Sequence, residues 1–132
     1  MTQGSSLVKP LDVLDQGDMY WGEDADARGS EQRDDRLWIV MSRRALNGNN
    51  TVVVIPATTK LAQAEKHPAF CIRIPANEQI PIIGQSASRD RAALCHQLRV
   101  FDKIRLREKW GKVSLSAIPS IQLGLTYLFD IR

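Results

Sequence analysis

Short apolar runs separated by turn residues form the main pattern along this chain. Residues 37–42 are almost continuously apolar, residues 51–55 are rich in β-branched side chains, and Asn47-Gly48-Asn49-Asn50 between them is a strong turn signal. The two runs predict a central hairpin that is buried on both faces, with Pro56 ending its second strand. Other runs predict strands at 19–21, 70–74 and 92–100, a loop at 61–68, and a short edge strand at 80–83.

Two helices are expected late in the chain. Residues 103–109 read as a short basic helix, with Asp102 as its N-cap and Gly111 as its stop. A second helix is predicted from one helical stripe, with Ser116 as its cap and Pro119 in its first turn. The stripe consists of Ile118, Ile121, Leu125, Leu128 and Phe129. Many short strands with two late helices predict a mainly β, α+β domain: a small antiparallel β-barrel with helical lids.

The hairpin brings two chemically useful residues to one end of the sheet. Arg36 precedes its first strand and Thr58 follows its second, so both emerge at the same end. An arginine and a hydroxyl that converge in this way make a phosphate-binding site. The alternatives are that Arg36 forms a surface pair with Asp34 or Asp35 and that Thr58 is an ordinary strand-end residue.

Charge is distributed unevenly along the chain. Residues 1–35 carry nine acids against three bases, whereas residues 36–132 carry six acids against fifteen bases, and the net charge is +3. The basic part suits a groove for a polyanion or a surface for an acidic protein, although a generic solvated surface is also consistent with it. Several acids fall in an expected loop at 22–35; they could hold a divalent ion, but without regular spacing a solvated loop is preferred.

The composition is that of a single globular domain of 132 residues. We expect a flexible tail at 1–12 and one domain at 13–132. No apolar run is long enough to span a membrane and no signal peptide is evident, so a cytoplasmic location is expected. Cys71 and Cys95 are too few for a disulfide framework or zinc site and are expected to be buried free thiols. His67 and His96 are expected to be core or rim residues rather than an acid–base pair.

No glycine-rich phosphate loop, Ser-His-Asp pattern or metal-ligand spacing is present, so no metal or cofactor is expected.

Several motifs together resemble the MazF/PemK family of toxin endoribonucleases from bacterial toxin–antitoxin modules. The resemblance covers about residues 14–130. Its most specific part is Gly29-Ser30-Glu31-Gln32, followed four residues later by Arg36 and an apolar strand. It continues through 51–59, which end in Ala-Thr-Thr, and through Gln97-Leu98-Arg99-Val100-Phe101-Asp102. The family usually has proline directly after the arginine, where this chain has Leu37.

The resemblance implies an SH3-like barrel of the MazF/PemK/CcdB toxin type, a homodimer, and sequence-specific, metal-independent cleavage of single-stranded RNA. It places the catalytic arginine at Arg36, the catalytic threonine at Thr58, and an active-site acid at Glu31. It also implies a partner, an acidic antitoxin of the MazE/PemI kind. The residues expected to contact RNA are Arg28, Ser30, Gln32, Arg33, Thr59, Lys60 and Arg99.

Two other readings of the same fold remain open from sequence. One is a non-catalytic toxin that poisons a protein target such as DNA gyrase. The other is a relative that binds RNA without cleaving it, for which Leu37 and the acidic loop are the grounds. An arginine–hydroxyl pair favours the nuclease, because a pure interaction surface does not need one.

Overall fold

The computed structural model describes the whole chain except residues 1–12, 24–34, 83, 85–86 and 132. The expected tail and most of the expected acidic loop therefore lie outside the described residues. The strands are β1 (Asp18–Glu23), β2 (Asp35–Val40), β3 (Thr51–Thr58), β4 (Cys71–Ile74), β5 (Gln79–Pro81), β6 (Arg91–Leu94), β7 (Arg99–Asp102) and β8 (Leu106–Val113). The helices are α1 (Ala62–Lys66) and α2 (Ile118–Leu128), with 3₁₀ turns η2 (Ala76–Glu78), η3 (Cys95–Gln97) and η4 (Lys103–Arg105).

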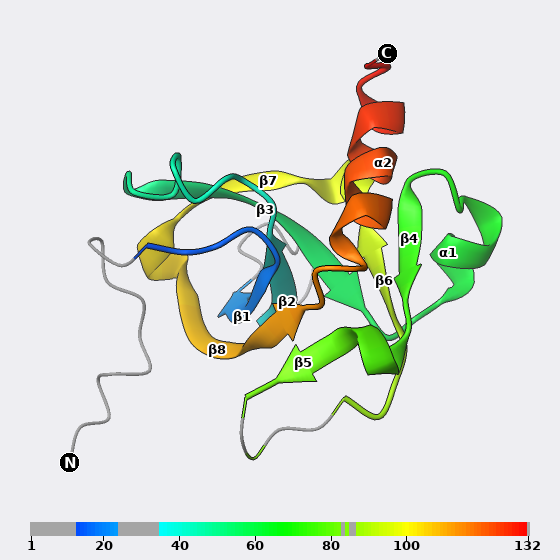
Figure 1. Cartoon of the computed structure of the whole chain (residues 1–132), viewed down its shortest axis with the longest axis horizontal. Coiled ribbons are helices and arrows are strands. Elements are labelled where there is room, and N and C mark those ends of the chain that lie inside the picture. Colours follow the sequence, from blue (N-terminus) through cyan, green and yellow to red (C-terminus); the bar gives the residue numbers. More distant parts are fainter. Residues whose placement is uncertain (1–12, 24–34, 83, 85–86, 132) are drawn as a thin grey trace, which may run out of the picture.

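The strands form one antiparallel sheet in the order β4-β6-β3-β2-β1-β8-β5, and β7 also pairs with β3. Figure 1 shows that this sheet is strongly curled into a half-barrel, with α2 and α1 on one side of it. The predicted mainly β fold is thus confirmed, as is the position of β5 at an edge. Within the described residues, no helix is long and apolar enough to cross a membrane.

The central hairpin is buried on both faces, as predicted. Leu37, Ile39 and Met41 pack into the core beneath α2, whereas Trp38 and Val40 pack into a second core on the opposite face. Because alternate side chains of a strand point to opposite faces, a strand shared by two cores must be continuously apolar.

The second strand of the hairpin does not end at Pro56, contrary to prediction. β3 runs on to Thr58. On its outer side β3 pairs with β7 as far as Val54 and with β6 from Ala57 onward. Pro56 lies between these two ladders, where the proline's missing N–H removes no hydrogen bond to β6 or β7.

The single strand predicted at 92–100 is two strands. β6 and β7 both pair with β3, but η3 inserts between them and shifts the register by three residues. The turn buries Cys95 in the core beneath α2 and leaves His96 exposed. Apolar periodicity alone does not reveal this interruption, because residues on both sides of it remain in the sheet.

Two further elements differ from prediction. Residues 103–109 are not a helix: η4 is a single turn without a side-chain cap from Asp102, and β8 follows it. The hydrogen-bonded pairing of β8 with β1 outweighs the local helix propensity of this charged segment. Part of the predicted loop at 61–68 is instead the short helix α1, which buries Ala64.

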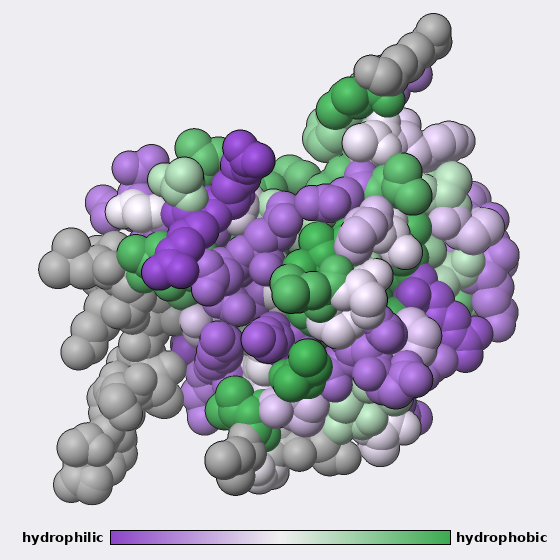
Figure 2. Space-filling model, in the orientation of Figure 1, coloured by the Kyte–Doolittle hydropathy of each residue, from purple (hydrophilic) through white to green (hydrophobic). Residues whose placement is uncertain are grey.

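The C-terminal helix is confirmed, with changes at both ends. Ala117, not Ser116, is at its N-cap position, and the Ser116 hydroxyl donates to Glu78 Oε1 at 2.6 Å instead. Phe129 lies just beyond the helix and is exposed. Figure 2 shows hydrophobic residues at the end of α2 that stands away from the sheet, where Ile131 is also exposed.

Candidate active site

The register of the hairpin brings Arg36 and Thr58 together at the end of the ladder between β2 and β3. Leu37 pairs with Ala57 in the antiparallel ladder between β2 and β3, and Arg36 and Thr58 are the next residues on either strand. Side chains directly opposite each other in such a ladder share one face of the sheet. On the other side of β2, Gly22 pairs with Arg36 and brings no side chain next to the guanidinium.

Both residues line an open pocket of about 190 Å³ at the end of these strands. Among the described residues, its lining includes Trp21, Asp35, Arg36, Leu37, Ala57, Thr58, Thr59 and Arg91. The described lining thus combines apolar side chains with the guanidinium groups of Arg36 and Arg91, the hydroxyl groups of two threonines and the Asp35 carboxylate. Such a combination suits an anionic group attached to a ring or another apolar body.

Arg36 is held from two directions. Its Nη1 donates to Gln97 Oε1 at 3.3 Å, and its guanidinium carbon lies 5.8 Å from the centre of the Trp38 ring. Trp38 is itself fixed, because its indole N–H donates to the Gly22 carbonyl at 3.1 Å. An arginine restrained in this way loses less side-chain freedom when it binds an anion.

Thr58 is half-buried at the last position of β3. Its Oγ1 accepts a hydrogen bond from the backbone N–H of Lys60 at 3.1 Å, which turns the chain away from the sheet. Thr59 and Lys60 are exposed just beyond it. The hydroxyl hydrogen of Thr58 can still be donated, because a hydroxyl donates and accepts at the same time.

Arg91 is a pocket residue that the sequence did not single out. It stacks over the Trp110 ring at 4.7 Å and donates to Oε1 of the buried Gln79. Burial lowers the pKa of Arg91 from its ordinary value, and repulsion from Arg89 lowers it further. The sequence offered only its position directly before the strand predicted at 92–100, and nothing in the sequence placed that strand next to Thr58.

Asp35 also lines the pocket, and its carboxylate forms an ion pair with Arg107 on β8. This pairing reduces the negative charge that an incoming anion would meet at the pocket. The described part of the site therefore has a positive balance, with Arg36 and Arg91 on its rim.

The structure gathers only some of the residues expected to bind RNA. Thr59 lines the pocket and Lys60 follows it, but Arg99 lies on β7 opposite Val54, four residues along β3 from Thr58. Five other candidates lie outside the described residues: Arg28, Ser30, Glu31, Gln32 and Arg33. Their roles remain predictions.

The cysteines and histidines are placed as the sequence suggested. Cys71 and Cys95 are buried free thiols, and burial raises the pKa of both, that of Cys95 to about 12. His67 and His96 are exposed on the surface and do not line the Arg36 pocket. Among the described residues, no three or more His, Cys, Asp and Glu side chains are grouped so that they could hold a metal ion.

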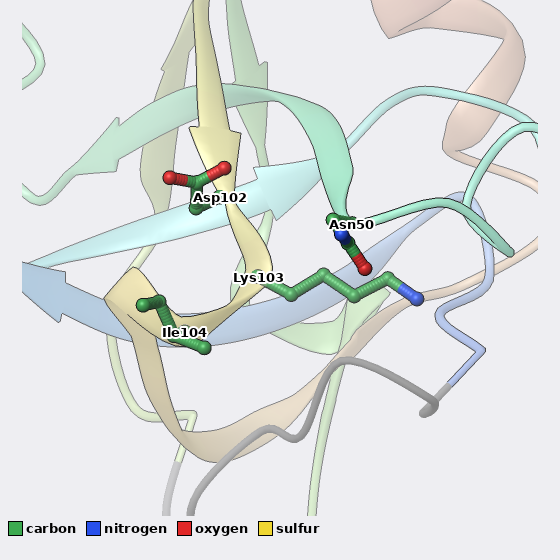
Figure 3. Close-up of a pocket in the computed structure, with 4 residues that line it drawn as sticks. All are labelled: Asn50, Asp102, Lys103 and Ile104. Atoms are coloured by element: carbon green, nitrogen blue, oxygen red, sulfur yellow. The ribbon is translucent and has the colours of Figure 1, made fainter.

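A separate pocket of about 250 Å³ lies at the β7–η4 turn, lined by Asn50, Asp102, Lys103 and Ile104. The backbone N–H of Lys103 donates to the Asn50 carbonyl at 2.8 Å, and only 1% of the Lys103 residue is exposed. Figure 3 shows its side chain running past Asn50 and away from the Asp102 carboxylate. The buried cation and the exposed acid therefore do not converge on a common ligand.

Comparison with known proteins agrees with this architecture. Residues 15–129 match the family described as PemK-like, MazF-like toxins of type II toxin–antitoxin systems. No curated protein matches the chain significantly. Among solved structures, the chain is similar to a MazE-MazF complex (Form-III) from Deinococcus radiodurans, with a TM-score of 0.66 and 22% identity, over 92% of this chain and 100% of that chain.

Two mycobacterial structures are also similar. An endoribonuclease from Mycobacterial species has a TM-score of 0.65 and 16% identity, over 92% of this chain and 96% of that chain. The Mycobacterium tuberculosis toxin MazF-mt6 has a TM-score of 0.65 and 14% identity, over 87% of this chain and 98% of that chain. These likenesses establish a shared fold, and the family match spans nearly all of the sequence. The chain therefore belongs to the PemK-like, MazF-like toxin family of type II toxin–antitoxin systems.

Proposed function

We propose that the protein is a toxin that cleaves single-stranded RNA at specific short sequences without a metal ion. The observation that carries this proposal is the cross-strand pair of Arg36 and Thr58 at an open pocket. A fixed cation beside a hydroxyl suits a phosphodiester, and family membership makes RNA the preferred source of that phosphodiester.

In the proposed reaction the 2′-hydroxyl of the substrate attacks the adjacent phosphorus. The bond from phosphorus to the 5′-oxygen of the next nucleotide breaks, which leaves a 2′,3′-cyclic phosphate and a 5′-hydroxyl end. Negative charge builds on the phosphoryl oxygens in the transition state. Arg36 and the Thr58 hydroxyl would stabilise this charge by donating hydrogen bonds to those oxygens.

The proton of the 2′-hydroxyl needs an acceptor, and solvent water in the open pocket would supply the proton that the departing 5′-oxygen takes up. Arg36 is a poor base because a guanidinium stays protonated at neutral pH. Glu31, which the family resemblance suggests as an active-site acid, is our proposal for the base. A Glu31→Gln variant should therefore cleave RNA more slowly than wild type in the same assay.

The test is incubation of the purified protein with a long RNA in EDTA, followed by analysis of product ends. Cyclic phosphate and 5′-hydroxyl ends are expected. Intact RNA, or products with 3′-hydroxyl ends, would contradict the proposal.

A pair of variants then assigns the chemistry to the pocket. Arg36→Ala should lower the cleavage rate by about a hundredfold or more, the loss seen when a donor to a transition-state oxyanion is removed. Arg43→Ala is the matched control, because Arg43 is exposed after the opposite end of β2. Both variants should melt close to wild type. Growth inhibition in cells that survives Arg36→Ala would favour a toxin that acts on a protein target.

We also propose an acidic antitoxin as partner, since one similar solved structure is a MazE-MazF complex, and a homodimer, which the family resemblance implies. Residues 36–132 carry a net charge of +9, which would attract an acidic segment. Binding of such a segment should weaken as salt is added and should compete with RNA. Salt-independent binding would contradict a mainly electrostatic interface.

A further inference from the structure

Four aromatic rings form a cluster on the surface beside α2. His67 stacks on Phe70 with ring centres 5.2 Å apart, and Tyr127 lies nearly parallel to Phe70 at 6.2 Å. His96 meets Phe70 edge-on at 5.1 Å. Phe70 is half-buried at the centre, whereas both histidines and Tyr127 are exposed, Tyr127 to 63%. We call these four residues the ring cluster.

The backbone beneath the ring cluster is firmly held. The Phe70 carbonyl accepts a hydrogen bond from the Cys95 N–H at 3.0 Å, and the Cys71 thiol lies 3.7 Å from Nδ1 of His96. Gly124 lets α2 approach closely, since a Cβ atom there would lie 2.9 Å from the Cys95 sulfur. Figure 1 shows α2 standing beside β4, which follows Phe70. The rings are therefore pre-positioned by the fold.

The ring cluster is continuous with the proposed active site through η3. His96 belongs to the cluster, and the next residue, Gln97, accepts the hydrogen bond from Arg36 at 3.3 Å. One short turn thus contacts the catalytic arginine on one side and an exposed aromatic platform on the other. The adjacent residues Gln97 and His96 therefore give an RNA strand bound at Arg36 a path along η3 to the rings.

We propose that the ring cluster is a base-stacking subsite for a nucleotide of the single-stranded RNA that binds at the Arg36 pocket. This inference rests on the proposed function of the Arg36 pocket. Exposed ring faces stack on any base because every base has a π-face, and a neighbouring cation holds the strand. Lys66, which is exposed and precedes His67, supplies such a charge next to the rings. Stacking would add affinity, while other residues would recognise the base sequence.

A binding experiment with uncleavable RNA tests the subsite. The probe is a fluorescent single-stranded RNA pool of random sequence with 2′-O-methyl groups on every ribose, which removes the attacking hydroxyl. Tyr127→Ala should weaken binding about tenfold, within the range for loss of one base–aromatic stack. Tyr127→Phe should bind like wild type, because it keeps the ring.

Leu123→Ala is the matched control. Leu123 is 68% exposed and lies one helical turn before Tyr127, so it carries apolar surface on the same face of α2 without a ring. It should leave RNA affinity unchanged. Equal losses for Leu123→Ala and Tyr127→Ala, with a parallel fall in oligomer mass by light scattering, would assign this face to a protein interface and overturn the proposal.

The remaining outcomes separate this inference from the proposed function. If wild type and Tyr127→Ala bind the pool equally, the stacking subsite is refuted while RNA cleavage at Arg36 stands. If wild type does not bind the pool and does not cleave RNA, both proposals fail together. Base-stacking would also quench a 2-aminopurine probe in wild type and not in Tyr127→Ala, and equal quenching would count against the subsite.

Discussion

Replacing Gln97 with alanine should slow RNA cleavage by loosening Arg36. The variant removes the acceptor that Arg36 Nη1 meets at 3.3 Å. A hydrogen bond to a charged group contributes about 1.5–3 kcal/mol. This one is longer than the usual 2.9 Å or so, which places it at the low end, about 1.5 kcal/mol. If that restraint acts in the transition state, the rate falls roughly tenfold.

The assay is steady-state cleavage of a short fluorogenic RNA that contains a mapped cleavage sequence. Gln97→Ala should lower kcat with little change in KM, because Arg36 keeps its charge but loses its fixed position. Gln97→Glu keeps an acceptor oxygen at the same reach and adds a negative charge beside the guanidinium. It should instead raise KM, since the carboxylate competes with the phosphate for Arg36.

Gln63→Ala provides the control for a change from glutamine to alanine, because Gln63 is exposed on α1. It should match wild type in rate and melting temperature. Unchanged kcat in Gln97→Ala, in a protein of normal melting temperature, would refute the view that η3 positions Arg36. An equal fall in rate for Gln63→Ala would show that the assay reports something other than the site.

Three further predictions concern stability. Gly124→Ala should lower the free energy of unfolding by about 1–2 kcal/mol in urea titrations, although alanine has the better helix propensity. The reason is that the new Cβ would lie 2.9 Å from the Cys95 sulfur and 3.0 Å from Ile72 Cγ1. A gain in stability would contradict the close packing. Burial raises the pKa of Cys95 to about 12, so between pH of about 9 and 12 the thiol ionises only in the unfolded chain. The folded protein should therefore lose stability as pH rises through this range, and Cys95→Ala should flatten the decline when melting temperature is measured against pH. The pKa of Asp90 is lowered mainly by the hydrogen bond from the Ala76 N–H and, to a lesser extent, by the one from Arg73. Asp90→Asn should therefore destabilise the protein at neutral pH but not well below the ordinary aspartate pKa. Equal losses of stability at both pH values would show that the carboxylate charge is not responsible.

The meeting of Arg36 and Thr58 could be predicted from the sequence because a tight hairpin constrains its own ends. Once residues 37–42 and 51–55 are joined by a short turn, the residues before and after them must emerge together, and Arg36 and Thr58 do so. The pairing needs no long-range information. The position of Glu31 lies outside the described residues, so that part of the candidate site stays a prediction.

Other parts of the site depended on contacts between distant segments. Gln97 reaches Arg36 only because η3 interrupts the sheet between β6 and β7, and Arg91 joins the pocket only because β6 pairs with the end of β3. The apolar pattern at 92–100 is the same for one strand as for two strands with a turn between them. Likewise, residues 106–109 are charged enough for a surface helix, yet they pair with β1 as a strand.

The sequence alone therefore determined the fold class, the central hairpin, the α2 stripe and the meeting of Arg36 with Thr58, because each follows from local periodicity or from a short turn. Tertiary structure decided where strands stop, which turns interrupt them, and which side chains from other strands surround the arginine. These outcomes depend on pairing energies between residues far apart in the chain, which outweigh local propensities of a few tenths of a kcal/mol per residue.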